Sequence, residues 1–330
     1  MLDLKIMPTP NAKVYAGIDV AKATLQVHVQ GRQAEFKNTP SGLRQLRQAL
    51  HKTPEVHVVC EATGGYERAL VQALHQGQIP VSVTNPAHVR AAAQACGQRA
   101  KTDRIDARML TEYGQRYEPA PTPPTTATQR QLVALTQWLQ QLIHGQALAK
   151  TQAEHHAEPF VRRQHAKLLT HLQSQIAAVE TQIQALLEQE AALKARVDAL
   201  DQIKGVGPRT AWMVLAHMPE LGTLNRQETA ALAGLAPWTR ESGQMKGMRA
   251  IGGGRPEVRQ ALYMASLSAV RFNPVLRPLY QHLRAKGKLP KVALTAVMRR
   301  LLIFMNHELK PLPSKAEGAQ KGERKNHQLR

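Results

Sequence analysis

The stretch Val14-Tyr15-Ala16-Gly17-Ile18-Asp19 decides the fold of the N-terminal part of this chain. Its first five residues are mostly apolar and predict a short strand, and its acidic residue stands at the strand's end. Leu25, Val27 and Val29 alternate with polar residues, which is typical of a half-buried second strand. A third strand is expected over 35–38, so the chain opens with three consecutive strands.

Helices and strands alternate after these three strands. Leucines at helical spacing predict a helix over 43–50, and a second helix is expected over 66–76. Apolar runs predict strands over 56–60 and 81–84. Three strands followed by helix, strand, helix, strand and helix is the order of the RNase H fold. We therefore expect an α/β, RuvC-like domain over residues 1–118.

The chain beyond this domain is expected to be helical. Prolines and threonines over 119–126 predict a stiff linker, and two long helices follow within 127–200. The second of these helices, expected over 161–200, has a coiled-coil seam in which Glu190 fills one position. The apolar seam residues are Ile176, Val179, Ile183, Leu186, Leu193, Val197 and Leu200. An antiparallel hairpin with the preceding helix and pairing between two chains would satisfy this seam equally well.

A mostly helical C-terminal domain is expected over 201–310. It opens with Gly205-Val206-Gly207-Pro208, which resembles the turn of a helix-hairpin-helix element. Backbone N–H groups in such a turn can approach a phosphate, although a plain turn is an equal alternative. Further helices are expected over 229–233, 257–270 and 291–309. The polar, basic tail over 311–330 is expected to be disordered.

Positive charge is the strongest global property of the sequence. The 330 residues include 44 Lys and Arg against 24 Asp and Glu, which gives a net charge of +20 and a pI near 10.3. Such an excess indicates a polyanionic partner, usually nucleic acid, and an anionic membrane surface is the competing interpretation. No apolar run reaches the ~18 residues of a spanning helix. Cys60 and Cys96, the only cysteines, support neither a disulfide framework nor a zinc site.

Four carboxylates stand where an RNase H-like nuclease needs them. Asp19 ends the first strand and Glu61 the fourth, and these strands are neighbours in that fold. Asp103 and Asp106 are three residues apart, so they share one face of a helix. Together they would suit two Mg²⁺ or Mn²⁺ ions, which assist phosphoryl transfer by stabilising the attacking and leaving oxygens. Each acid taken singly could instead belong to a turn, a solvated loop or a helix N-terminus.

Three blocks of sequence carry a more specific resemblance. The blocks are Gly17-Ile18-Asp19-Val20-Ala21-Lys22, Glu61-Ala62-Thr63-Gly64 and Lys101-Thr102-Asp103-Arg104-Ile105-Asp106-Ala107. They resemble the signature of the DEDD-type, RuvC-like transposases of the insertion-sequence family numbered one hundred and ten, which is related to the Piv DNA invertase. The likeness covers most of the chain outside the linker, coiled coil and tail. It implies that Asp19, Glu61, Asp103 and Asp106 are metal ligands.

A glycine-rich, basic segment over 240–259 is the second chemical feature. It contains Ser242 and the candidate phosphate contacts Arg240, Lys246, Arg249, Arg255 and Arg259. From the residues alone a flexible DNA-binding loop is the better interpretation, because no histidine base lies nearby and a serine needs activation to act as a nucleophile. The family resemblance implies the opposite. The family's Ser-Gly block matches Ser242, and in the family this serine attacks the DNA backbone and forms a covalent phosphoserine link.

The resemblance thus implies a DNA recombinase of a mobile element in the bacterial cytoplasm, associated with the nucleoid. It further implies donor and target DNA, a structured bridge RNA, and a homo-oligomer, dimer or tetramer, with a composite site between protomers. The residues leave two alternatives open. One is a metal-dependent, structure-selective nuclease such as a junction resolvase, with Ser242 a spectator. The other is a DNA-binding scaffold without enzymatic activity.

Overall fold

The computed structural model describes residues 13–98, 102–155, 158–239, 241–242, 245–246 and 249–310. The chain divides into two compact units, Met1–Pro124 and Thr125–Arg330. Within the described ranges, no helix has the length and apolar character needed to cross a membrane. The tail over 311–330, which the sequence predicts to be disordered, lies outside the described residues.

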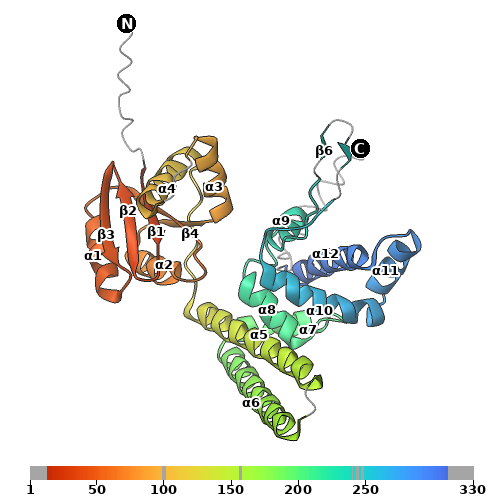
Figure 1. Cartoon of the computed structure of the whole chain (residues 1–330). Coiled ribbons are helices and arrows are strands. Elements are labelled where there is room, and N and C mark those ends of the chain that lie inside the picture. The colour runs from red at the N-terminus through yellow and green to blue at the C-terminus, as the bar shows by residue number, and fades with distance from the viewer. Residues whose placement is uncertain are drawn as a thin grey trace. The chain divides into compact units, whose positions relative to one another are not determined.

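A five-stranded sheet forms the centre of the first unit (Figure 1). Its strands are β1 (Val14–Val20), β2 (Thr24–Val29), β3 (Arg32–Lys37), β4 (Val56–Glu61) and β5 (Val81–Thr84). Their order is β3-β2-β1-β4-β5, with β1, β2 and β3 paired antiparallel and β4 and β5 running parallel to β1. This topology confirms the RNase H-like order predicted from the sequence.

Helices cover both faces of this sheet. They are α1 (Pro40–Leu50), α2 (Glu67–Gln76), α3 (Pro86–Ala95) and α4 (Asp103–Tyr117). Leucines of α1 and α2 share a core with Ile18 of β1. On the other face, Val89 of α3 and Leu110 of α4 pack with Tyr15 and Val59. Side chains alternate along a strand, so β1 contributes to both cores.

The proline-rich segment after α4 is hydrogen-bonded to the edge of the sheet. The N–H of Thr122 donates to the carbonyl of Val81 over 2.8 Å. The hydroxyl of Ser82 donates to the carbonyl of Pro119 over 2.9 Å. The first half of the segment that the sequence predicts as a linker, residues 119–122, is therefore held on β5.

The second unit is mostly helical (Figure 1). Its helices are α5 (Ala127–Glu154), α6 (Pro159–Gln189), α7 (Ala191–Asp201), α8 (Pro208–His217), α9 (Arg226–Leu232), α10 (Pro256–Phe272), α11 (Leu276–Ala285) and α12 (Pro290–Glu308). α5 and α6 pack against each other as a hairpin. Seam residues of α6, such as Ile176 and Ile183, are buried in one core with Leu132 and Leu139 of α5. The seam is thus covered within the chain, as the hairpin interpretation expects.

The helix that the sequence predicts over 161–200 is in fact two helices. α6 ends at Gln189 and α7 begins at Ala191, and Glu190 between them has φ −127° and ψ 78°, outside the helical region. Burying a carboxylate in an apolar seam is costly. Instead, Glu190 Oε1 accepts a hydrogen bond from the hydroxyl of Thr128 over 2.6 Å. The helix breaks at the one polar seam position, and α7 then packs on α8.

A glycine turn joins α7 to α8, where the sequence predicts a helix-hairpin-helix turn. Gly205 has φ +101°, and a Cβ at this position would lie 2.7 Å from the Cα of Ala269 in α10. Only glycine combines that torsion with so close an approach. α11 was not predicted, because Pro278 interrupts the helical pattern. Pro278 lies in the first turn of α11, where a missing N–H costs no hydrogen bond.

Candidate active site

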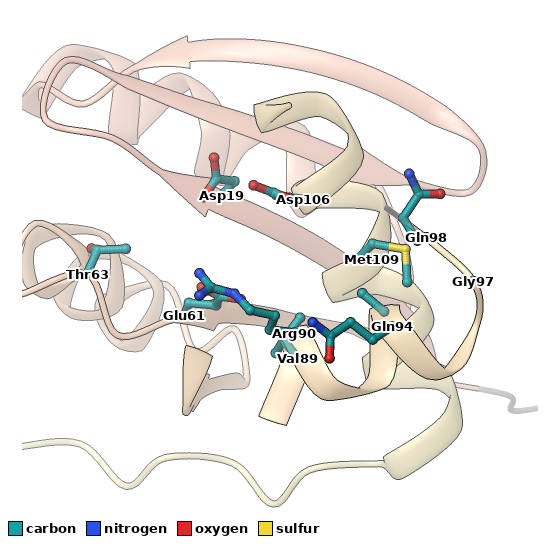
Figure 2. Close-up of a pocket in the computed structure, with 11 residues that line it drawn as sticks. Asp19, Glu61, Thr63, Val89, Arg90, Gln94, Gly97, Gln98, Asp106 and Met109 are labelled. Carbon is teal, nitrogen blue, oxygen red and sulfur yellow. The ribbon is translucent and has the colours of Figure 1, made fainter. Parts of the chain in front are cut away.

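Three acidic side chains from different elements line one cavity in the first unit (Figure 2). Asp19 comes from β1, Glu61 from the end of β4 and Asp106 from α4. The cavity has a volume of about 640 Å³. Its other lining residues are Thr63, Val89, Arg90, Ala93, Gln94, Gly97, Gln98 and Met109. The structure therefore brings together three of the four acids that the sequence predicts as a site.

Parallel pairing of β1 and β4 places Asp19 and Glu61 at the same edge of the sheet. In this register Ile18 lies opposite Cys60, and each acid is the next residue along its strand. Both acids are half-buried, whereas the residues before them are buried. The register is strongly specified, because a slip of one residue would turn the apolar side chains of a strand to the wrong face.

α4 holds Asp106 near Asp19 through a close approach of the helix to β1. At Gly17 of β1, a Cβ would lie 2.0 Å from the carbonyl oxygen of Ala107 and 2.5 Å from the backbone nitrogen of Thr111. Only a residue without a side chain allows this approach. Figure 2 shows the carboxyl group of Asp106 pointing toward Asp19.

Hydrogen bonds of Thr111 also stabilise the contact between α4 and β1. Its buried Oγ1 accepts from the N–H of Gly17 over 2.9 Å. The same oxygen lies 2.9 Å from both the Nδ1 and the carbonyl oxygen of His28 on β2. Burial and the nearby charge of Arg108 lower the pKa of His28, which favours a neutral ring. Sequence reasoning missed Thr111, because a single threonine on a helix gives no pattern.

Asp103 does not line the cavity. It is the first residue of α4 and is exposed, whereas Asp106 is half-buried. Asp103 and Asp106 are three residues apart, which separates them by about 4.5 Å along the helix axis. Residues on one face of a helix can therefore differ in whether their side chains reach the cavity. The part of Asp103 in the site stays a prediction.

The donor set of the cavity fits a hard divalent cation in its chemistry. Carboxylate oxygens are the ligands that Mg²⁺ and Mn²⁺ prefer. Within the part of the chain that the structure describes, no three Asp, Glu, His or Cys side chains are close enough to hold one ion. Asp19, Glu61 and Asp106 are the described side chains of this cavity that could provide carboxylate oxygens to such an ion.

Glu67 fixes the loop that follows Glu61, and sequence reasoning missed it. Its Oε2 accepts hydrogen bonds from the N–H of Thr63 over 3.0 Å, the hydroxyl of Thr63 over 3.0 Å and the N–H of Gly65 over 2.9 Å. Burial raises the pKa of Glu67, but these hydrogen bonds and one from its own N–H outweigh burial and lower it. The available signal was an acid in the first turn of a helix after two glycines.

The thiol of Cys60 takes no part in this chemistry. Burial, with a smaller contribution from Glu67 and Glu61, raises the pKa of Cys60 to about 12. A thiol with that pKa stays protonated at neutral pH and is not a nucleophile.

Ser242 lies in a short antiparallel hairpin of the second unit, where the sequence predicts a loop. β6 (Glu241–Ser242) pairs with β7 (Met245–Lys246), so the backbone of Ser242 lies opposite that of Met245. An isolated bridge between Trp238 and Ala250 continues the pairing toward the base of the hairpin. Arg240, a predicted phosphate contact, lies outside the described residues.

The structure gives the other predicted phosphate contacts different surroundings. Arg249 is exposed. Arg255 forms an ion pair with Glu220, with Nη1 and Oε1 2.5 Å apart. Arg259 Nη1 donates to the carbonyl of Gly253 over 2.7 Å. Two of these cations are therefore engaged inside the unit. For Lys246 the structure describes the backbone pairing with Glu241.

Close backbone packing explains Gly254 in the glycine run at 252–254. Gly254 has φ +60°, and a Cβ there would lie 2.2 Å from the backbone nitrogen of Gly234. Gly234 has φ +66° and approaches the carbonyl oxygen of Gly253 equally closely. The base of the serine hairpin is thus packed against the end of α9 through backbone contacts that side chains would prevent.

Comparisons with known proteins cover both units. A transposase model of the DEDD type, named for IS110, matches residues 16–159, and the model "Transposase IS116/IS110/IS902 family" matches residues 197–281. The pilin gene-inverting proteins of Moraxella bovis and Moraxella lacunata are each 30% identical over 305 residues, which is 88% of this chain and 94% of theirs. Among solved structures, Thermus thermophilus RuvC aligns with 17% identity and a TM-score of 0.27, covering 33% of this chain and 99% of its own.

The sheet topology and the acidic cavity define the first unit as an RNase H-like, RuvC-type domain, here joined to a mostly helical region. The chain belongs to the IS110 family of DEDD transposases, enzymes that recombine DNA. Membership implies a carboxylate site for a divalent metal in the first unit.

Proposed function

We propose that this transposase cuts and rejoins DNA strands through a covalent intermediate on Ser242, assisted by the carboxylates of the first unit. One observation supports this most strongly. Asp19, Glu61 and Asp106 come from three elements and line one cavity, at the place where RNase H-like enzymes perform phosphoryl transfer. The hairpin with Ser242 lies in the segment matched by the second transposase model, 197–281.

The exchange on Ser242 needs no external energy source. A bond forms between Oγ and the phosphorus as the bond from phosphorus to a deoxyribose oxygen breaks. The proton of the serine hydroxyl is balanced by the proton that the leaving oxygen takes up. Attack by a deoxyribose hydroxyl of another strand reverses both changes and releases the serine, so the number of phosphodiester bonds is conserved.

Asp19, Glu61, Asp106 and, by the family motif, Asp103 would hold Mg²⁺ or Mn²⁺. Such ions stabilise charge on the attacking and leaving oxygens of a phosphoryl transfer. Other residues would position these ligands. Gly17 and Thr111 set the distance of α4 from β1, and Glu67 holds the loop after Glu61 in place.

The partners we propose are donor DNA, target DNA and a bridge RNA. The net charge of +20 suits all three. Arg240, Lys246 and Arg249, which are near Ser242 in the sequence, are the first candidates for phosphate contacts. Arg255 and Arg259 could contact phosphate only after giving up the partners that hold them inside the unit. A dimer or tetramer with a site shared between protomers completes the proposal.

A pair of substitutions tests the proposed function. The substrate is a supercoiled plasmid with the genomic sequence that flanks the gene for this chain, incubated with the full-length protein and its co-purified RNA. Ser242→Ala should lose covalent protein–DNA adducts and strand transfer, and Asp19→Asn should lose cutting, by at least about 100-fold each. Adducts undiminished in Ser242→Ala would exclude the serine, and cutting without adducts would favour a junction-resolving nuclease.

Sequencing of the co-purified RNA tests the guide. A discrete RNA encoded beside the gene is the expected result. A purified protein that recombines DNA after complete removal of RNA would contradict the bridge RNA and leave the serine mechanism standing.

A further inference from the structure

The wall of the acidic cavity that α3 contributes contains no acid. Val89, Arg90, Ala93 and Gln94 all line the cavity, and their spacing of one and four residues places them on one face of the helix. Val89 is buried in a core with Met109 of α4. α3 is thus anchored to the helix that provides Asp106, and its position is set by packing.

Arg90 is the one cationic side chain among the described residues that line this cavity. It is exposed, and Figure 2 shows it extending from α3 toward Glu61. The ion pairs within 4 Å in the described part of the chain do not include it. An exposed cation that lines an acidic cavity can reach an incoming anion.

We propose that Arg90 is the phosphate-binding side chain of this cavity, and that its guanidinium binds a nonbridging oxygen of the DNA phosphate that is cut. The proposal rests on the proposed function, because it assumes that the cavity acts on a phosphodiester. A guanidinium matches phosphate through a planar fork of N–H donors, which also fixes the orientation of the phosphate.

The negative charge of the cavity explains why a cation would be needed there to bind a phosphate. The negative charges of Asp19, Glu61 and Asp106 repel a phosphodiester, and metal ions held by these residues would offset part of that repulsion. Arg90 approaches from α3, an element that provides no metal ligand, and would neutralise the phosphate from a separate direction. Positive charge at this position would stabilise the negative charge that develops on the phosphate during cutting.

The competing role for Arg90 is a counter-ion that merely relieves repulsion among the carboxylates. The two roles predict opposite effects on metal binding. A counter-ion competes with the cation, so its removal should tighten Mn²⁺ binding. Arg90 is exposed, so solvent and salt screen its charge from the metal site in the free protein. If it acts on the phosphate, its removal should leave the Mn²⁺ affinity of the free protein unchanged.

The test uses Arg90→Ala and Arg90→Lys in the full-length protein, with Arg44→Ala as the matched control. Arg44 is an exposed arginine on α1, on the face of the sheet away from α3 and α4. Calorimetry measures Mn²⁺ affinity without DNA, and single-turnover nicking of the flank-carrying plasmid measures the rate of cutting. For Arg90→Ala we expect unchanged Mn²⁺ affinity and nicking slowed by about 100-fold. Arg90→Lys should recover only part of the rate, because an ammonium lacks the fork.

A chemical change in the DNA locates the contact. Once the nick is mapped, a methylphosphonate at that position removes the charge of the phosphate. If Arg90 binds this phosphate, the loss caused by Arg90→Ala should shrink on the neutral substrate, because the two changes remove the same interaction. The Arg44→Ala protein should match the unsubstituted protein on both substrates.

Three results overturn the proposal: nicking by Arg90→Ala at the unsubstituted rate, tighter Mn²⁺ binding in that variant, or an unchanged loss on the methylphosphonate. The nicking rate of Asp19→Asn distinguishes a wrong role for Arg90 from a wrong proposed function. If Asp19→Asn still nicks, the cavity is not the site of cutting. If Asp19→Asn is inactive and Arg90→Ala is normal, only the role of Arg90 is wrong.

Discussion

Single residues in the first unit show how a loop can be ordered by one carboxylate. The Oε2 atom of Glu67 accepts hydrogen bonds from the N–H groups of Thr63 and Gly65. Gly64 and Gly65 have φ +71° and +116°, torsions that glycine adopts without strain. Because Thr63 lines the acidic cavity, the order that Glu67 provides reaches the candidate active site directly.

Glu67→Gln should remove a pH-dependent part of the stability of the first unit. The pKa of Glu67 is lowered in the folded state, so the unfolded chain binds its proton first as the pH falls. The resulting stabilisation is complete at pH 7 and is lost as the pH falls from the ordinary glutamate value of about 4.3 through the lower folded-state value. At pH 7 we expect the variant to be less stable by about 1 kcal/mol, a modest figure because Glu67 is only half-buried.

Urea unfolding of both proteins between pH 7 and pH 3 measures this difference. The two stabilities should converge at the acid end, where the glutamate has become neutral like the glutamine. A difference that stays constant across this range would show that the carboxylate charge is not the cause.

The sequence predicted some of these residues and not others for a physical reason. Asp19 and Glu61 each follow a buried apolar strand, and that local pattern identifies both the element and the acid at its end. Thr111 and Glu67 act through contacts with loops and strands elsewhere in the chain, and no local pattern marks such contacts. That Arg90 lines the cavity could not be predicted either, because the side of α3 that faces the cavity depends on how α3 packs on α4.

At the scale of elements, the contact between β1 and α4 determines the geometry of the acids. Gly17 and Gly114 both allow it: a Cβ at Gly114 would lie 2.6 Å from the ring of Tyr15 on β1. Because α4 packs this closely on β1, a side chain added between them would push the helix away from the strand. Packed interiors tolerate little added volume.

Gly17→Ala should therefore impair both stability and cutting. The added methyl group meets the backbone of α4 at Ala107, and we expect a loss of about 1–3 kcal/mol in the free energy of unfolding. The displaced helix carries Asp106 away from Asp19, so strand cutting should fall even at temperatures where the variant is fully folded. Denaturant unfolding and the plasmid nicking rate measure the two effects.

Gly145→Ala is the control for this substitution. Gly145 lies within α5 and a Cβ there has no neighbour within 4 Å. The same change should stabilise the protein by about 1 kcal/mol through helix propensity and leave cutting unaltered. If Gly17→Ala behaved in the same way, the close approach of α4 would have no functional consequence.

Element boundaries in the second unit were harder to predict than element types. The apolar seam of α6 continues into α7 at the right spacing, and the sequence therefore indicates one helix. The break depends on whether Glu190 can find a polar partner, and Thr128 provides one from α5, sixty-two residues earlier in the chain. The sequence likewise predicts a loop in place of the serine hairpin, because paired segments of two residues are too short for strand periodicity to appear.

The whole molecule is built from two units with separate hydrophobic cores. The cores of the first unit contain residues of β1–β5 and α1–α4, and the core of the second contains residues of α5–α12. No described core cluster includes residues of both units. The acidic cavity and the serine hairpin therefore rest on separate cores.

Independent cores predict two unfolding transitions in calorimetry. Ile18→Ala empties a fully buried site in the first unit, and Leu215→Ala does the same in the second. Each should cost about 2–5 kcal/mol and lower the transition of its own unit alone. If either substitution lowered both transitions together, the two units would unfold as one cooperative body. The acidic cavity and the serine hairpin would then share one stability, and a substitution in the α5–α12 core would also destabilise the cavity that contains Asp19.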